Sequence, residues 1–360
     1  MRMYHVLGLM SGTSLDGLDM VYVKFWQNTL SWQYLVLDAQ TFPYSIKIVE
    51  KLKNAHTFSI EQVCLLDYEL ALLWSSWINT KKYPLLDCIA SHGHTVLHAP
   101  EQGYTLQIGN PAHIATATKT PVIADFRRGD VALGGTGAPL VPFGEKYLFD
   151  CYHYPVFLNL GGIANYSFHD TTKNQVLASD MVFVNIPIND LMMHFFNQPF
   201  DENGNTARQG KLISELLENL EKWHFIEKNS PKSLGREQYE TEIKPILQIY
   251  FIHDAESILH TYTDFIARTI VKSFKPYVHS ELNVFVTGGG VHNLFLMQLL
   301  QEYGKKENIT FFIPETAVVD YKEAIIFAFL GLMRWLNFPN TLPSVTGAKK
   351  SISGGGVWLP

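Results

Sequence analysis

The chain has 360 residues, of which 47% are hydrophobic and 17% charged, and its formal net charge is −6. This length exceeds one ordinary core and suits two domains, and the apolar content excludes a disordered chain. The acidic balance argues against a general nucleic-acid-binding protein. The chain shows neither a secretory signal pattern nor an apolar run long enough to cross a bilayer, so we expect a cytoplasmic protein that binds neither nucleic acid nor membrane.

The three cysteines, Cys64, Cys88 and Cys151, do not have the spacing of a metal site. Apolar residues flank them, and cysteines in a reducing compartment stay as free thiols. We therefore expect three buried structural thiols.

Apolar runs and small-residue turns repeat one pattern in the two halves of the chain. Each half opens with strand, turn and strand, which is typical of a hairpin, followed by a third strand. In the first half we expect strands at residues 6–10, 20–25, 30–39, 86–90 and 122–124 and helices at 60–78 and 112–118. In the second half we expect strands at 156–160, 166–168, 175–178, 282–286 and 309–313 and helices at 254–274, 293–303 and 321–336.

Alternating helices and buried strands predict an α/β protein with parallel strands. We expect two α/β domains that face each other across a cleft. The segment 134–139, which is rich in glycine and ends in proline, is the expected junction. The predicted domains are 1–133, with a phosphate loop, and 134–360, whose C-terminal tail packs back on the first domain.

The first turn, residues 8–19, combines three glycines, two serines, a threonine and two aspartates. Glycines let a backbone approach phosphate closely, and N–H groups and hydroxyls bind its oxygens. The carboxylates of Asp16 and Asp19 would repel a phosphate. We therefore expect Mg²⁺ between these carboxylates and the phosphate, held through water. The alternative is a plain hairpin turn, which favours the same residue types. No Walker A pattern is present.

Eight segments in order resemble the motifs of the anhydro-N-acetylmuramic acid kinases, a family within the sugar kinase, Hsp70 and actin group. They are residues 8–19, 91–98, 106–109, 125–130, 134–142, 159–165, 287–293 and 342–348. The resemblance implies two ribonuclease H-like domains with a nucleotide cleft between them. It also implies ATP and Mg²⁺ as cofactors and an amino sugar as substrate, with a role in peptidoglycan recycling.

The implied reaction opens the 1,6-anhydro ring of anhydro-N-acetylmuramic acid with water while O6 receives the γ-phosphate of ATP. It needs a carboxylate base for the water. The resemblance identifies Asp180 as that base, at the end of a strand, and Asn185 as a substrate-binding residue. A helix N-cap is the alternative role for Asp180. Between them the chain departs from the family, because Met181, Val182, Phe183 and Val184 replace Thr, Gly, Pro and Gly. We expect these larger side chains to narrow the pocket.

The remaining site residues are also carried over from the resemblance. The nucleotide-binding residues are Gly12, Thr13, Ser14, Leu15, Asp16, Gly17, Leu18, Asp19, Gly161, Gly162, Gly288, Gly289 and Gly290. The substrate-binding residues are Ser11, His92, Thr95, Asp125, Arg127, Asp130 and Asn185. Asp16 and Asp19 are the expected magnesium residues.

Alternative readings stay open at this point. Arg127 lies between Asp125 and Asp130 in the sequence. It could bind the lactyl carboxylate of the sugar or belong to a surface ion-pair cluster. His92, His94 and His98 invite a zinc interpretation, but no Cys, Asp or Glu completes a ligand set nearby. The chain could phosphorylate another anhydro or amino sugar, or bind ATP without being a kinase. A homodimer is a further expectation.

Overall fold

The structure is a computed structural model that describes residues 2–12, 14–28, 31–173 and 175–360. The chain forms two compact units, one made of Met1–Asp150 with Tyr321–Pro360 and the other of Cys151–Asp320. The division differs from the predicted 1–133 and 134–360, because the expected junction at 134–139 lies inside unit 1. The C-terminal forty residues also belong to unit 1.

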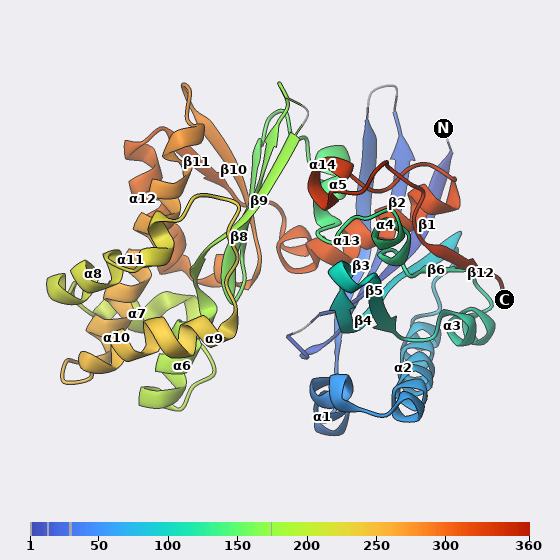
Figure 1. The fold of residues 1–360 in the computed structure, drawn as a ribbon, viewed down its shortest axis with the longest axis horizontal. Helices are drawn as coiled ribbons and strands as arrows, with labels where there is room; N and C mark the ends of the chain where they lie inside the picture. Colours follow the sequence, from blue (N-terminus) through green and yellow to red (C-terminus); the bar gives the residue numbers. More distant parts are fainter. Residues whose placement is uncertain (1, 13, 29–30, 174) are drawn as a thin grey trace. The chain divides into compact units, whose positions relative to one another are not determined.

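Unit 1 contains a mixed seven-stranded sheet in the order β12-β6-β4-β1-β2-β3, with β5 paired to β4 (Figure 1). The strands are β1 (Met3–Ser11), β2 (Gly17–Gln27), β3 (Trp32–Pro43), β4 (Cys88–Ala99), β5 (Tyr104–Ile108), β6 (Val122–Ala124) and β12 (Gly356–Trp358). The first three strands form an antiparallel meander, and β1 pairs in parallel with β4. The end of β1 therefore lies beside the middle of β4, where Ser11 pairs with His94.

Helices cover both faces of this sheet. They are α1 (Ile46–Asn54), α2 (Ile60–Lys81), α3 (Pro111–Thr118), α4 (Arg128–Ala132), α5 (Val141–Leu148), α14 (Pro343–Thr346) and most of α13 (Thr316–Trp335). Successive strand residues point to opposite faces. Leu7 and Leu9 accordingly join the core under α2, whereas Gly8 between them lies against Ala324 and Ala328 of α13.

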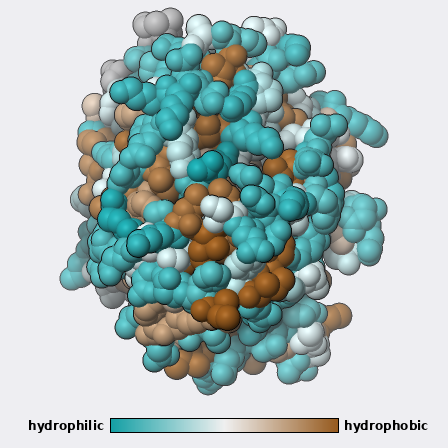
Figure 2. All heavy atoms as spheres, turned by 90° about the vertical axis from the view of Figure 1, so that its left-hand side faces the viewer, coloured by the Kyte–Doolittle hydropathy of each residue, from teal (hydrophilic) through white to brown (hydrophobic). Residues whose placement is uncertain are grey.

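Unit 2 contains a five-stranded sheet in the order β11-β10-β7-β8-β9. Its strands are β7 (Val156–Leu160), β8 (Ile163–Asp170), β9 (Gln175–Phe183), β10 (Leu282–Thr287) and β11 (Ile309–Phe312). Its longer helices are α6 (Asn185–Phe196), α8 (Ser214–Glu221), α10 (Lys244–Ile249), α11 (Ala255–Phe274) and α12 (Leu294–Lys306), with the short α7 (Asn205–Gln209) and α9 (Arg236–Gln238). On the face shown in Figure 2, polar side chains surround separate groups of apolar ones.

The α/β class and the two opening hairpins are confirmed, but several elements extend beyond their predicted ranges. The strand expected at 86–90 begins at Cys88 and continues to Ala99. The strand expected at 175–178 continues to Phe183. Cys64 is exposed on α2, so the prediction of three buried thiols is wrong for this one. Within the described part of the chain, no helix is long and apolar enough to span a membrane.

Candidate functional site

The glycine-rich turn of unit 1 joins β1 to β2. Ser14 donates a 2.7 Å hydrogen bond to Asp16 Oδ1, and Leu15 adopts a left-handed backbone with φ 61°. A Cβ on Gly12 would meet only atoms of Ser14, at 3.5 Å or more. Space is therefore kept open at Gly12, as a phosphate-binding turn requires. Thr13 lies outside the described residues.

Two other residues assigned to the nucleotide in this turn, Gly17 and Leu18, have packing roles, and so does Gly8 at its start. A Cβ on Gly8 would lie 2.2 Å from the carbonyl oxygen of Ala324, and one on Gly17 would lie 2.4 Å from that of Phe42. The Leu18 side chain is fully buried in the core under α2. Packing thus explains why position 17 needs a glycine and why position 18 carries an apolar side chain. The structure provides no reason for a nucleotide contact by the Leu18 side chain.

The two acidic residues of the turn present oxygen atoms on the same hairpin. Asp16 is exposed, and Asp19 on β2 accepts a 2.6 Å hydrogen bond from Thr41 Oγ1. Among the described residues, no group of three His, Cys, Asp or Glu side chains is placed to hold a metal. Two carboxylates fit Mg²⁺, because this ion usually keeps several waters and takes its other oxygens from phosphate. The same finding gives no support to the zinc interpretation of the histidines.

Behind the turn, Ser11 lies in a buried chain of hydrogen bonds. Tyr44 donates to Ser11 Oγ at 2.8 Å, and Ser11 Oγ lies 3.0 Å from Nδ1 of His94. Burial raises the pKa of the Tyr44 hydroxyl, so Tyr44 keeps its proton and acts as the donor. Burial also lowers the pKa of His94, which favours the neutral ring. The orientation of the Ser11 hydroxyl is therefore fixed from two sides.

Arg127 and His92 form a second buried polar pair in unit 1. His92 Nδ1 lies 2.8 Å from the carbonyl oxygen of Gly93, so this nitrogen carries the proton. Its Nε2 then accepts from Arg127 Nη2 at 2.7 Å and Nε at 3.1 Å, while Nη1 donates to Gly137 O at 2.8 Å. Desolvation, followed by the charge of Arg127, lowers the pKa of His92 to about 3.

Asp130 does not have the environment of a substrate-binding residue. It is 0% exposed, its Oδ2 accepts from Gly137 N at 2.8 Å, and its Oδ1 accepts from Thr346 Oγ1 at 2.8 Å. Both oxygens are therefore used to anchor the segment 134–137 and the C-terminal part of the chain. These contacts favour a structural role for Asp130 over the substrate-binding role expected from the sequence.

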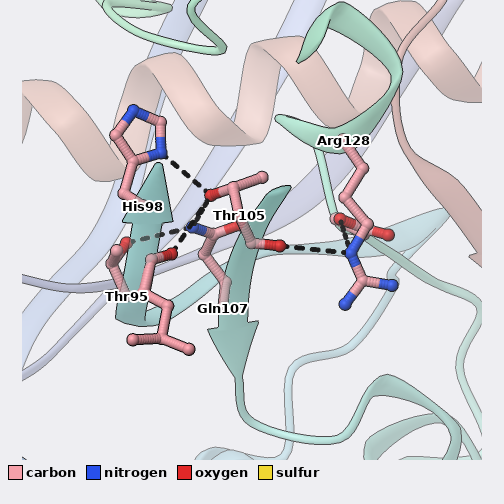
Figure 3. A network of polar contacts seen from close by, with 7 residues as sticks. Thr95, His98, Thr105, Gln107 and Arg128 are labelled. Atoms are coloured by element: carbon pink, nitrogen blue, oxygen red, sulfur yellow. Dashed lines mark hydrogen bonds and ion pairs between the residues drawn. The ribbon is translucent and has the colours of Figure 1, made fainter. Parts of the chain in front are cut away.

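Thr95 belongs to a polar network on β4 and β5 (Figure 3). Gln107 Nε2 donates to Thr105 Oγ1 at 2.8 Å and to Thr95 Oγ1 at 3.3 Å, and His98 Nδ1 lies 2.9 Å from Thr105 Oγ1. Arg128 Nε reaches the Thr105 carbonyl oxygen at 3.4 Å, in the same figure.

A cavity of about 490 Å³ lies within unit 1 beside this network, and His92, Gln107, Asp125 and Arg128 contribute to its lining. Asp125 has a left-handed backbone with φ 60° and forms a 3.4 Å ion pair with Arg128. Desolvation raises the pKa of Asp125, whereas the charge of Arg128 lowers it. The ion-pair alternative thus applies to Asp125 and Arg128, while Arg127 is bound to His92.

In unit 2, the structure brings the two glycine turns and Asn185 together. The turns follow β7 and β10, which are neighbouring parallel strands. Asn185 N donates to Gly161 O at 3.3 Å and Val184 N donates to Gly162 O at 2.8 Å. A Cβ on Gly289 would lie 3.9 Å from Asn185 Nδ2, and Gly288 has a φ of 91°. Open backbone at strand ends beside the first turn of α6 is the kind of environment that binds phosphate.

Asp180 lies inside β9, three residues before the strand ends, and not at its end as predicted. Its Oδ2 accepts from Leu234 N at 2.8 Å and from Ser233 Oγ at 3.2 Å, and its own N donates to Lys232 O at 2.9 Å. Desolvation raises the pKa of this carboxyl, and the hydrogen bonds from Leu234 and Ser233 lower it.

The four large residues that follow Asp180 are all at most 1% exposed. Met181, Val182, Phe183 and Val184 belong to the core of unit 2, where Phe183 stacks on Trp223. These side chains are larger than the family residues to which the resemblance matches them, and their volume packs into the core of unit 2. The expectation that they narrow a pocket is therefore wrong.

Sequence reasoning missed several polar groups near these residues. Tyr44, Gln107 and the segment 232–234 were not singled out, and neither was Glu323 on α13. Desolvation raises the pKa of Glu323, whereas the charges of Lys322 and Arg127 lower it. For 232–234 no local signal was present, because the sequence on both sides of this segment is mostly polar as well. Tyr44 contacts Ser11, 33 residues away in the chain, whereas Gln107 contacts Thr105 and Thr95, 2 and 12 residues away.

Comparison with known proteins gives one consistent match. The family model of anhydro-N-acetylmuramic acid kinase covers residues 4–360. The anhydro-N-acetylmuramic acid kinase of Bacillus thuringiensis (strain Al Hakam) is 34% identical over 100% of both chains, and that of Bacillus cereus (strain 03BB102) is 35% identical over 99% of both. Among solved structures, the activator of the 2-hydroxyisocaproyl-CoA dehydratase from Clostridium difficile with bound ADPNP aligns with 91% of this chain and 94% of its own. That alignment has 12% identity and a TM-score of 0.43. On the full-length sequence matches, the chain belongs to the anhydro-N-acetylmuramic acid kinase family.

Proposed function

We infer that this chain is the kinase for which its family is named. It transfers the γ-phosphate of ATP to O6 of 1,6-anhydro-N-acetylmuramic acid, with water opening the ring, and so serves peptidoglycan recycling. The observation that carries this function is the match over residues 4–360, which includes the phosphate turn, both glycine turns of unit 2 and Asp180. The roles of individual residues below are proposals.

Asp180 is the proposed general base. Its carboxylate takes a proton from water as the water oxygen bonds to the anomeric carbon and the bond from that carbon to O6 breaks. O6 then bonds to the γ-phosphorus, and the bond from phosphorus to the β-phosphate oxygen breaks to release ADP. The water supplies the new hydroxyl group of the product, so atoms and charge balance.

The phosphates are proposed to bind at the open backbone of the three glycine turns. In unit 1 this is Gly12 with Ser14 and Leu15, and in unit 2 it is Gly161, Gly162 and Gly289. Gly288 and Gly290 lie in the same turn, but a Cβ on either would overlap Asn159 or Leu160, so they are required for packing. Asp16 and Asp19 would hold Mg²⁺ through water. The ion would offset the negative charge that develops on the transferring phosphate.

Ser11, Asp125 and Arg127 are the proposed sugar contacts in unit 1, with Asn185 and Thr95 as further contacts. Both ring nitrogens of His92 are already bound, so its proposed role is to orient Arg127. Arg127 supplies a fixed positive charge that suits the lactyl carboxylate of the sugar, since guanidinium and carboxylate groups form strong paired hydrogen bonds. Ser11 supplies a hydroxyl group whose orientation is set by Tyr44 and His94.

Cytoplasmic localisation and a homodimer are proposed as well. The use of ATP supports the first, and sedimentation of the purified protein at several concentrations tests the second.

The function is tested by measuring ADP formation by the purified protein with ATP, Mg²⁺ and 1,6-anhydro-N-acetylmuramic acid. We expect ADP only when the anhydro sugar is present, in equal amount to a sugar 6-phosphate, and far less with ring-opened N-acetylmuramic acid. Absence of sugar-dependent turnover in a correctly folded preparation would reject this function.

A further inference from the structure

The two oxygens of the Asp180 carboxylate have different environments. Oδ2 accepts hydrogen bonds from the Leu234 amide at 2.8 Å and the Ser233 hydroxyl at 3.2 Å. Within the described residues, Oδ1 accepts none, and it is not a buried atom without a partner. One oxygen is thus anchored, and the other has no hydrogen-bond partner among the described residues.

The segment that supplies these donors is bound firmly to the strand that carries Asp180. β9 is an edge strand of its sheet, so its backbone is open on one side. Asp180 N donates to Lys232 O at 2.9 Å, and Lys232 N donates to Ser179 Oγ at 3.0 Å. These two hydrogen bonds, one to the backbone and one to the Ser179 hydroxyl, place Ser233 and Leu234 beside the carboxylate.

The positive charge of Lys232 is directed away from Asp180. Its Nζ donates to the carbonyl oxygens of Phe225 at 2.8 Å and Ile226 at 3.2 Å, and it lies 4.5 Å above the Phe225 ring. Among the described residues, no charged side chain pairs with Asp180. The two neutral donors are therefore what stabilises its ionised form against burial.

A base for water needs an ionised carboxylate with a free oxygen in a fixed direction. Two donors that converge on Oδ2 fix the rotation of the carboxylate and leave Oδ1 unpaired. We propose that Ser233 and the Leu234 amide are positioning groups for Asp180, which hold Oδ2 so that Oδ1 takes the proton of the attacking water. This inference rests on the proposed function.

The test compares Ser233→Ala with wild type in sugar-dependent ADP formation across pH 4.5–8.5. Ser233 is exposed, so the variant should fold, and thermal unfolding checks this. Removing a hydrogen bond to the ionised form makes Asp180 harder to ionise. We expect kcat to fall about ten- to a hundredfold, in line with the usual strength of a hydrogen bond to a charged group, and the acidic limb of the kcat profile to move to higher pH. KM for ATP and sugar should stay within about twofold of wild type.

Two further variants make the result specific. Ser233→Thr keeps the hydroxyl and should restore most of kcat and the position of the acidic limb. Ser273→Ala is the matched control, because Ser273 Oγ donates to the Thr269 carbonyl within α11 and does not contact Asp180. This control should behave as wild type.

The outcomes separate this inference from the proposed function. If Ser233→Ala has the wild-type kcat and pH profile while Asp180→Asn is inactive, the positioning role is overturned and the base remains. A higher KM for the sugar at unchanged kcat would also overturn it, because Ser233 would then bind substrate directly. If Asp180→Asn itself keeps wild-type activity, the assignment of the base fails instead.

Discussion

Nε2 of His92 accepts hydrogen bonds from two nitrogens of Arg127, at 2.7 and 3.1 Å. The other ring nitrogen is bound to the Gly93 carbonyl oxygen, so His92 must be neutral to make both interactions. A neutral histidine next to the guanidinium fixes the direction of Arg127 without adding a charge, and Glu323 supplies the opposite charge that acts on it. That arrangement suits the recognition of an anionic group on a substrate.

The first prediction concerns acid stability. The pKa of His92 is about 3 in the folded protein, against about 6.5 in an unfolded chain. Below pH 6.5 the unfolded state binds a proton that the folded state does not, so stability falls as pH falls until about pH 3. Between pH 7.5 and 5.5, the free energy of unfolding measured with denaturant should fall by about 1.4 kcal/mol more for wild type than for His92→Gln. Equal losses would show that His92 titrates normally.

The second prediction separates the glycines of the phosphate turn. Gly12→Ala should leave the melting temperature unchanged, because a Cβ has space there, and should weaken ATP binding about tenfold or more by occupying that space. Gly8→Ala should destabilise the protein by about 1–3 kcal/mol or more, because its Cβ would overlap the Ala324 carbonyl oxygen. ATP titration and thermal unfolding of both variants check this. Wild-type ATP affinity in Gly12→Ala would contradict the phosphate role.

The third prediction tests the structural role of Asp130. Asp130→Ala leaves the buried Gly137 amide and Thr346 hydroxyl without their acceptor. Each buried unpaired group costs about 1–3 kcal/mol, so a large loss of stability is expected. Asp125→Ala is the control and should cost much less, because Asp125 is about 30% exposed. A stable Asp130→Ala protein with a raised KM for the sugar would restore the substrate-binding assignment.

The fourth prediction concerns the divalent cation. Chelation should abolish ADP formation, and added Mg²⁺ should restore it. Asp16→Asn and Asp19→Asn should each raise the Mg²⁺ concentration needed for half-maximal activity about tenfold, since each removes one negative charge near the ion. Asp38→Asn serves as a control, because that carboxylate pairs with Lys81 on the same unit. An unchanged Mg²⁺ requirement in both turn variants would place the ion elsewhere.

Local patterns were enough to predict the hairpins and their small-residue turns. A run of apolar residues followed by Gly, Ser, Thr and Asp specifies a strand and an open turn through short-range chemistry, as at Gly12. The same holds for the turns at Gly161 and Gly289, whose neighbours are close in sequence or on the next strand.

Contacts between distant segments could not be predicted in this way. The donors to Asp180 lie 53 and 54 residues further along the chain, and the partner of Asp130 on the C-terminal segment lies 216 residues away. No pattern near Asp130 shows that its carboxylate is buried. The residues after Asp180 illustrate the same limit, because their size alone did not tell whether they face a pocket or the core.

The most direct test of the role of Asp180 is turnover by Asp180→Asn beside wild type, with ATP and 1,6-anhydro-N-acetylmuramic acid bound at saturation. We predict that the variant binds both ligands with affinities close to wild type and forms ADP about a thousandfold more slowly, because the base that activates water is lost. Asn differs from Asp by one group, so the core around Met181 and Phe183 should be unaffected. Turnover within tenfold of wild type would contradict the central claim that Asp180 is the base.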